Sequence, residues 1–273
     1  MNEFFSTVFQ EYISNEYPGD MKLDFTDPSI VYTRLAYNWY LLKQKTEDHI
    51  YFELLRVYRD ILSTKNNLIS IIVVGSVARG FSYPESDVDL VVIVDTRDTA
   101  DKLQYNSSYK DVNIVYRTKN EFLRNYKKGY EFFVWSVRYG LPLYDNNFFF
   151  KLYMEPISVI FKEEILFKRT YINKTVKNVY ESITNSDLVL AISLIKKIAI
   201  QIGRIIIITK NIIPKSRPEL EQQLFSIDTN FYMLYIQLKE LSAMSKQQLT
   251  DYTESIYSYL NDYLQAYYQT NES

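Results

Sequence analysis

Two acids and a Gly-Ser pair within one short segment are the residues of this 273-residue chain best placed to do chemistry. Gly75 and Ser76 follow the apolar run Leu68–Val74, and Asp87 and Asp89 stand at the start of a second apolar run. Residues two apart on a strand project from one face with Cα atoms about 6.6 Å apart, so the two carboxylates repel unless a cation lies between them. Mg²⁺ prefers hard oxygen ligands and is commonly bound by one or two carboxylates together with substrate phosphates. The spacing therefore predicts a magnesium site at Asp87 and Asp89.

Gly75 and Ser76 predict a second part of the same site, a phosphate cradle. Glycine directly after a buried strand lets the backbone turn sharply, and Ser76 can then present its hydroxyl and N–H at the start of a short helix. Each feature also has a plainer interpretation, since Gly-Ser after a strand is commonly a turn and Asp-x-Asp on a strand is commonly a solvated face. The combination favours a site because a buried sheet rarely keeps two adjacent unpaired acids.

The elements that must position these residues can be predicted from hydrophobic periodicity. Apolar residues at i, i+3, i+4 and i+7 predict an amphipathic helix over about 47–64. Three β-branched runs predict strands at Leu68–Val74, Val88–Val94 and Val112–Tyr116. A helical face from residue 120 ends at Gly140, before a short extended exit at Leu141–Asp145.

After Pro156 the strand signals stop, and further helices are expected at about 157–183, 186–210, 217–225 and 229–267. The predicted organisation has three parts: an N-terminal helical extension over 1–45, an α/β core over 46–150 and a helical bundle domain over 151–273.

Composition excludes several other kinds of site. The chain has no cysteine, which excludes disulfides, thiolate zinc sites, iron–sulfur clusters and a cysteine nucleophile. The single histidine, His49, must supply the imidazole of any catalytic triad, and its polar surroundings favour a surface residue. A net charge of -2 gives no case for a protein that coats nucleic acid. Without a signal peptide or a membrane-length apolar run, we expect a cytoplasmic protein with no membrane partner.

The segment around the acids resembles a known family. Gly75-Ser76 at a strand end, followed about ten residues later by Ser86-Asp87-Val88-Asp89-Leu90, is similar to the signature of the DNA polymerase beta-like nucleotidyltransferase superfamily. The fuller pattern, Gly-Ser-x-Ala-Arg-Gly and then Ser-Asp-x-Asp-Leu, resembles the minimal nucleotidyltransferase type and covers roughly residues 50–145. The resemblance implies an α/β (α+β) fold in which a core with a small mixed sheet precedes a C-terminal helical bundle.

The resemblance also implies an activity. Asp87 and Asp89 would hold Mg²⁺ or Mn²⁺, and the nucleotide-binding residues would be Gly75, Ser76, Arg79 and Ser86. A nucleoside monophosphate, expected to be AMP from ATP, would pass to an acceptor hydroxyl on a protein, an RNA end or a small molecule, with pyrophosphate leaving. For Arg79 two roles stay open: positive charge near the pyrophosphate, or a structural salt bridge.

One position departs from the family's pattern. The third carboxylate of the family lies between apolar residues at the start of the next strand, where this chain has Asn113. Asparagine can coordinate a metal through its carbonyl oxygen but cannot take a proton. Asp111, two positions earlier, can reach the site after a small shift in register. The candidate catalytic set is therefore Asp87, Asp89, Asp111 and Asn113.

Two other hypotheses remain open. The chain can be a catalytically degenerate member of the fold that acts as a nucleotide-binding or oligomeric structural module, as Asn113 permits. It can also be a helical interaction protein whose motif is coincidental. The C-terminal helix carries more tyrosines than one buried stripe needs, which is consistent with a homodimer.

Overall fold

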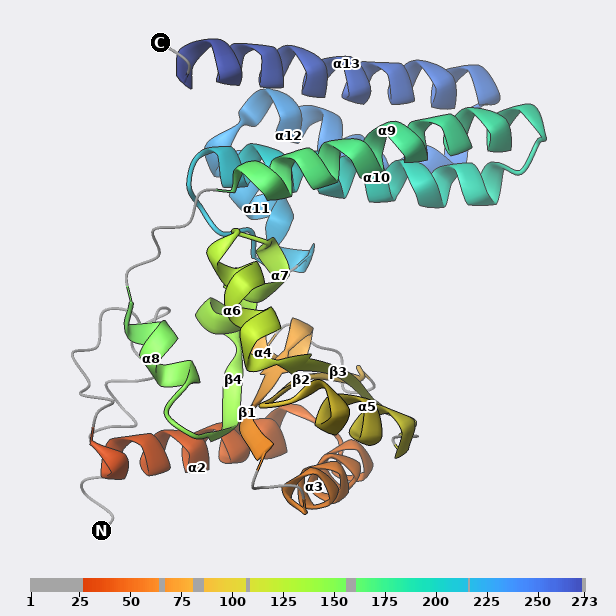
Figure 1. Cartoon of the computed structure of the whole chain (residues 1–273). Coiled ribbons are helices and arrows are strands. Elements are labelled where there is room, and N and C mark those ends of the chain that lie inside the picture. The colour runs from red at the N-terminus through yellow and green to blue at the C-terminus, as the bar shows by residue number, and fades with distance from the viewer. Residues whose placement is uncertain are drawn as a thin grey trace. The chain divides into compact units, whose positions relative to one another are not determined.

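The computed structural model describes residues 27–63, 67–80, 86–106, 109–155, 161–215 and 217–271. Contacts divide the chain into two compact units, shown with the chain coloured from red to blue in Figure 1. Unit 1 comprises Met1–Lys119 and Gly140–Ile157, and unit 2 comprises Asn120–Tyr139 and Ser158–Ser273. The domain boundaries expected from the sequence, 1–45, 46–150 and 151–273, stay a prediction.

A four-stranded mixed sheet with the strand order β3-β2-β1-β4 lies at the centre of unit 1. Strand β1 (Leu68–Val74) pairs antiparallel with both β2 (Val88–Val94) and β4 (Leu141–Asp145), whereas β3 (Val112–Thr118) runs parallel to β2. The two inner strands, β1 and β2, are buried along almost their whole length. Burial on both faces explains their continuous β-branched sequence.

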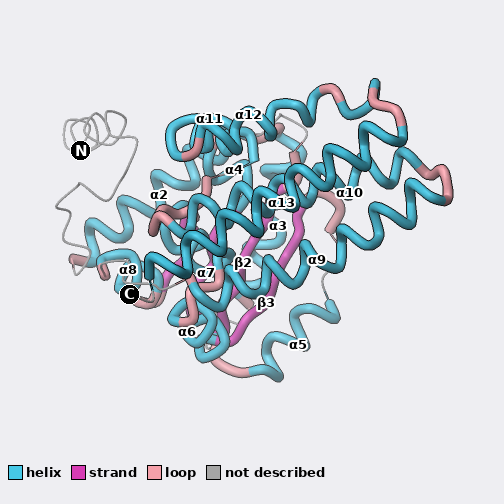
Figure 2. The backbone as a smooth tube through the Cα atoms, turned by 90° about the horizontal axis from the view of Figure 1, so that it is seen from above, coloured by secondary structure: helices cyan, strands magenta, loops and turns pink. Residues whose placement is uncertain are grey.

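Two parts of this sheet differ from the sequence-based expectation. Parallel neighbours need a crossover, and α5 (Arg97–Asn106) provides it between β2 and β3, lying next to β3 in Figure 2. The segment between the second and third predicted strands had no predicted element, because it is polar and the few apolar residues of α5 give only a weak helical pattern. The extended exit at Leu141–Asp145 is a full member of the sheet, β4.

Helix α2 (Pro28–Lys45) precedes the sheet and packs on its β4 edge. It begins at a capping residue, because the Asp27 carboxylate accepts a hydrogen bond from the Ser29 N–H at 2.8 Å. The buried Asn38 side chain donates to the Pro142 carbonyl at 2.7 Å. This bond fixes the middle of α2 against β4.

Three more helices complete the described part of unit 1: α3 (Asp48–Leu62), α4 (Gly75–Arg79) and α8 (Phe149–Met154). Helix α3 confirms the amphipathic pattern of the sequence. The Asp145 carboxylate accepts the backbone N–H groups of Phe148–Phe150 at 2.8 to 3.3 Å, which orders the start of α8.

The helix expected from residue 120 to Gly140 is two helices, α6 (Lys119–Lys127) and α7 (Glu131–Tyr139). Gly129 divides them with a φ of +74°. The Tyr130 N–H bonds the Asn125 carbonyl at 3.2 Å and the Gly129 N–H bonds the Tyr126 carbonyl at 3.0 Å, which is the Schellman pattern of a helix end. The apolar face continues across the break, so periodicity alone predicted one helix.

The rest of unit 2 is helical, and α9, α10 and α13 run side by side in Figure 1. The helices are α9 (Lys162–Thr184), α10 (Leu188–Thr209), α11 (Arg217–Ile227), α12 (Thr229–Ile236) and α13 (Lys246–Asn271). The most apolar of these, α10, is buried through its C-terminal half. Within the described ranges, no helix has the length and apolar character needed to cross a bilayer.

The expected helix over 229–267 is interrupted by two 3₁₀ turns, Gln237–Lys239 and Leu241–Ala243. Helix α13 then begins with a reciprocal capping box. The Gln248 N–H donates to the Ser245 hydroxyl at 3.3 Å, and the Ser245 N–H donates to the Gln248 side-chain oxygen at 2.8 Å. This Ser-x-x-Gln signal was available in the sequence and marks the true helix start.

Candidate active site

Strand register brings Asp87, Asp89 and Asn113 to one end of the sheet. Asp89 is the cross-strand partner of Val74 on β1 and of Asn113 on β3. The Asn113 side-chain N–H group donates to Asp87 Oδ2 at 3.1 Å and to Asp89 Oδ1 at 3.4 Å. The two carboxylates therefore face a single amide group, and Asn113 lies in the same cluster as the two acids.

Among the residues that the structure describes, none forms an ion pair with Asp87 or Asp89. Burial raises the pKa of Asp89 above its ordinary value, the hydrogen bond from Asn113 lowers it, and the nearby charge of Asp87 raises it. Asp87 is exposed and Asp89 is half-buried. A cation placed between the two carboxylates would remove both the repulsion and the desolvation penalty.

Gly75 allows the Asp89 carboxylate to approach the turn after β1. Gly75 has a φ of +78°, and a Cβ added there would lie 2.5 Å from Asp89 Oδ2. Glycine adopts this backbone conformation without strain, and only a residue without a side chain leaves room for the carboxylate. The phosphate-cradle turn and the acidic pair are thus adjacent.

The substitution Gly75→Ala is expected to lower the free energy of unfolding by about 1 to 3 kcal/mol. Alanine is strained in this left-handed backbone conformation, and its Cβ would clash with the Asp89 carboxylate. It should also displace the carboxylate and weaken Mg²⁺ binding. Denaturant unfolding with and without Mg²⁺ measures both effects, and Gly129→Ala, a positive-φ glycine outside the site, is the control for strain alone. Equal Mg²⁺ stabilisation in the two variants would contradict the role of Gly75.

The other expected nucleotide-binding residues lie around this turn. Ser76 is in the first turn of α4, is half-buried, and its hydroxyl forms no hydrogen bond to any described residue. Arg79 is at the end of α4, half-buried, and Ser86 lies two residues before β2. The Ser76 hydroxyl is therefore available to a phosphate oxygen.

Asp111 occupies a different environment from Asn113. Its carboxylate lies 3.8 Å from His49 Nε2, and the other ring nitrogen of His49 lies 3.2 Å from Glu47. The backbone N–H of Asp111 donates to the Glu53 carboxylate at 3.2 Å, which ties the start of β3 to α3. In the described part of the chain, no hydrogen bond or ion pair joins Asp111 to the two acids of the cluster.

Asp111 nevertheless lies level with Asp87 at the edge of the sheet. The Val88 N–H donates to the Asp111 carbonyl at 2.9 Å, and the register places Val88 opposite Val112. Sequence analysis missed the contact between His49 and Asp111, since His49 is 60% exposed and nothing local in the sequence links it to β3.

Residues 55–136 match the family model of the nucleotidyltransferase domain. The chain carries a nucleotidyltransferase domain. The mixed sheet with helices after it confirms the polymerase beta-like fold implied by the signature residues. Among solved structures, a nucleotidyltransferase-like protein from Exiguobacterium sibiricum 255-15 matches 76% of this chain and 74% of its own chain, with 16% identity and a TM-score of 0.46. No curated protein sequence matches the chain.

The acidic cluster of the nucleotidyltransferase domain fits a divalent cation. Its donors are hard carboxylate oxygens that face one point, and the Asn113 amide adds a carbonyl oxygen if the side chain turns over. Across the described residues, no group of three or more acids or histidines is arranged to hold a metal ion. A pair of carboxylates completed by substrate phosphates is a common arrangement for Mg²⁺.

Proposed function

We propose that the chain is a Mg²⁺-dependent nucleotidyltransferase that moves a nucleoside monophosphate, AMP from ATP, to an acceptor hydroxyl on a protein, an RNA end or a small molecule. The observation that carries the proposal is the convergence of Asp87 and Asp89 on one point beside Gly75. In this reaction the acceptor oxygen bonds to the α-phosphorus, the bond from that phosphorus to the β-phosphate oxygen breaks, and pyrophosphate leaves.

The residues of the site have separate roles in this proposal. Asp87 and Asp89 hold the metal ion, which supplies charge neutralisation to the phosphoryl group in transfer. The Ser76 hydroxyl and the backbone N–H groups of the turn bind the β- and γ-phosphates, and Arg79 adds positive charge on the pyrophosphate side. Asn113 orients the two carboxylates. The α-phosphate thus lies between the acids and the phosphate-binding turn.

We assign to Asp111 the role of general base, the group that takes the proton from the acceptor hydroxyl. It lies level with Asp87 on the neighbouring strand, and Asn113 cannot accept a proton. His49 Nε2 lies 3.8 Å from the Asp111 carboxylate and helps to orient it. In that role Asp111 touches the acceptor, whereas His49 is a positioning residue.

The variant Asp111→Asn is expected to lower kcat about a hundredfold, because it removes general-base catalysis while leaving the metal and phosphate ligands in place. The KM for ATP should change less than threefold. Steady-state pyrophosphate release across pH 5 to 9 checks this, and His49→Gln should show a smaller loss. If Asp111→Asn left kcat unchanged, Asp111 would not be the general base, and the base would have to be a group of the acceptor itself.

The test of the function is pyrophosphate release from each of the four nucleoside triphosphates with Mg²⁺ or Mn²⁺, with α-labelled ATP to reveal a labelled acceptor. Release with label transfer to an acceptor is the expected result. A second candidate, a nucleotide-binding module without catalysis, is favoured by one observation: Asn113 replaces a carboxylate and donates to both acids. Metal-dependent ATP binding without any pyrophosphate release would select that candidate.

A further inference from the structure

Asn113 joins the two acids of the candidate active site through its side-chain amide. Its Nδ2 lies 3.1 Å from Asp87 Oδ2 and 3.4 Å from Asp89 Oδ1, so one N–H of the amide points to each carboxylate. A carbonyl oxygen in the same place would face two negative groups, so the neighbouring charges favour this orientation of the amide. The amide thus occupies the two carboxylate oxygens that a bridging cation would need.

The side chains of this cluster differ in how freely they can move. Asp89 is half-buried, and its other oxygen, Oδ2, lies beside Gly75, where an added Cβ would come within 2.5 Å of it. Asn113 is exposed on β3, an edge strand of the sheet, and the last torsion of an asparagine side chain is soft. A cation that enters the cluster is therefore accommodated by movement of Asn113 rather than of Asp89.

A divalent cation and the two amide N–H groups cannot share this point, because both are positive. A half-turn of the amide about its last torsion moves the N–H groups away and brings the carbonyl oxygen, a hard ligand of the kind that Mg²⁺ prefers, to the same side. The turn also supplies a third protein ligand. Among the described residues, no group of three or more acids or histidines is arranged to supply one.

We propose that Asn113 is a turning ligand of the metal site: it donates to Asp87 and Asp89 when no cation is bound, and it coordinates the cation through its carbonyl oxygen when one binds. The inference rests on the proposed function and adds a metal-dependent movement to its site. A neutral third ligand holds a bare cation less firmly than a third carboxylate would, because less negative charge faces the cation and two hydrogen bonds must break first.

The first experiment measures Mg²⁺ binding by titration calorimetry to the full chain and to two variants. Leucine has nearly the shape of asparagine but neither donates nor coordinates, so Asn113→Leu is expected to weaken Mg²⁺ binding about tenfold. Asn113→Asp is expected to tighten it about tenfold or more. Asn67→Asp is the matched control and should change nothing, since it adds the same charge to an exposed residue before β1, at the opposite end of the sheet.

A second measurement follows the amide itself. In the full chain labelled with ¹⁵N at asparagine, the side-chain NH₂ signals of Asn113 are those that Asn113→Leu removes. Their hydrogen exchange is expected to become faster on addition of Mg²⁺, because the bonds to the two carboxylates are broken. The NH₂ signals of Asn67, assigned in the same way with Asn67→Asp, should not change.

The outcomes separate this inference from the proposed function. Equal or tighter Mg²⁺ binding to Asn113→Leu would overturn the inference, because the amide would then only orient the acids or compete with the cation. Signals of Asn113 that Mg²⁺ leaves unchanged would also overturn it, and in both cases label transfer from ATP would keep the function. Mg²⁺-dependent turning of Asn113 without label transfer would support the inference and remove the function. If Mg²⁺ does not bind to the unaltered chain, the inference is overturned and label transfer alone decides the function.

Discussion

The double variant Asp87→Asn/Asp89→Asn is expected to lose nucleotidyl transfer by a factor of about 10³ or more. Removing both metal ligands removes several kcal/mol of charge stabilisation from the transition state, and each 1.36 kcal/mol is a tenfold change in rate. Label transfer from α-labelled ATP measures the loss. Transfer that persists at a tenth of the original rate would exclude the two acids as metal ligands.

The same double variant should be more stable than the unaltered chain when no metal is present. Burial and the charge of Asp87 raise the pKa of Asp89 in the folded state, so its ionised form opposes folding at neutral pH. The stability that a raised acid pKa contributes is present below the unfolded pKa of about 4 and is lost as pH rises through the folded value. The asparagines should therefore stabilise the metal-free chain at pH 7, and this gain should disappear as the pH falls toward 4.

Unfolding in urea with a chelator, repeated with excess Mg²⁺, measures both effects at once. Mg²⁺ should stabilise the unaltered chain and leave the double variant unchanged, because only the former has ligands to bind it. Asp98→Asn/Asp101→Asn on α5 is a matched control, since it removes two acids from unit 1 away from the cluster. A variant that is less stable than the unaltered chain at pH 7 would show that the acids serve the fold.

The second large effect is expected in unit 2, where α7, α9 and α10 share a buried network of charges. Lys168 Nζ lies 2.8 Å from Glu131 Oε2 and 2.9 Å from Glu164 Oε1, and it donates to the Gln201 side chain at 2.8 Å. Arg204 is ion-paired with Glu131. Glu131, Glu164 and Lys168 are each less than 10% exposed, so these charges depend on one another.

The substitution Glu131→Gln is expected to lower the free energy of unfolding of unit 2 by about 3 to 5 kcal/mol, because it leaves a buried positive charge uncompensated. Glu163→Gln is the control, since Glu163 and Lys128 form an ion pair whose side chains are 49% and 44% exposed, and its loss should change stability by less than about 1 kcal/mol. Each unit contains one of the two tryptophans, Trp39 and Trp135. Fluorescence of Trp135 in a Trp39→Phe background reports unit 2 alone.

A loss of less than about 1 kcal/mol on Glu131→Gln would mean that water already reaches the network. The double variant Glu131→Gln/Arg204→Met gives a further check, because removing both of these charges leaves the Lys168–Glu164 pair balanced and should recover part of the loss.

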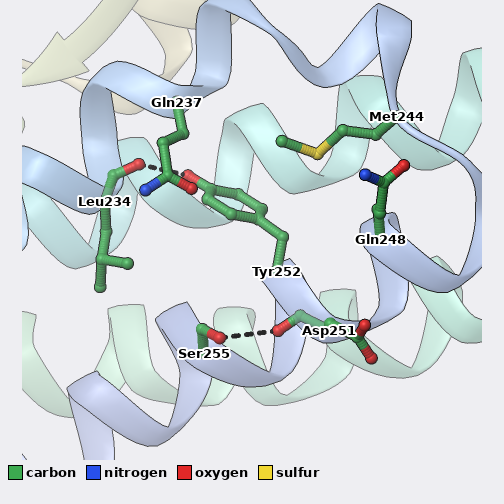
Figure 3. Close-up of a pocket in the computed structure, with 7 residues that line it drawn as sticks. All are labelled: Leu234, Gln237, Met244, Gln248, Asp251, Tyr252 and Ser255. Atoms are coloured by element: carbon green, nitrogen blue, oxygen red, sulfur yellow. Dashed lines mark hydrogen bonds between the residues drawn. The ribbon is translucent and has the colours of Figure 1, made fainter.

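Unit 2 contains a pocket lined by residues of α12, the first 3₁₀ turn and α13. It has a volume of about 250 Å³ and lies between the 3₁₀ turns and α13, as Figure 3 shows. Its polar groups are already engaged: the Tyr252 hydroxyl donates to the Leu234 carbonyl at 2.8 Å, and Asp251 accepts from Gln247 at 2.7 Å. The Gln248 side-chain oxygen also accepts from the Ser245 N–H at 2.8 Å, so these lining groups are already bonded within the chain.

The sequence predicted those parts of the fold and of the candidate site that depend only on neighbouring residues, such as burial patterns and residue spacing. The β-branched runs predicted three strands correctly because burial on both faces requires such residues, and a spacing of two placed Asp87 and Asp89 on one side of β2. The break at Gly129 was missed because the apolar face continues through it. The contact between His49 and Asp111 was missed because it joins α3 to β3, which no short window of sequence contains.

Residues 120–139 interrupt unit 1 and belong to unit 2, which has a consequence for synthesis on the ribosome. Glu131 leaves the exit tunnel before its partners Lys168 on α9 and Arg204 on α10, which follow it by 37 and 73 residues, have emerged. At about 5 to 20 residues per second, it waits for seconds without them. During that interval the Glu131 carboxylate stays in contact with water. Because the last segment of unit 1 follows the first segment of unit 2 along the chain, the two units complete their folding in overlapping periods.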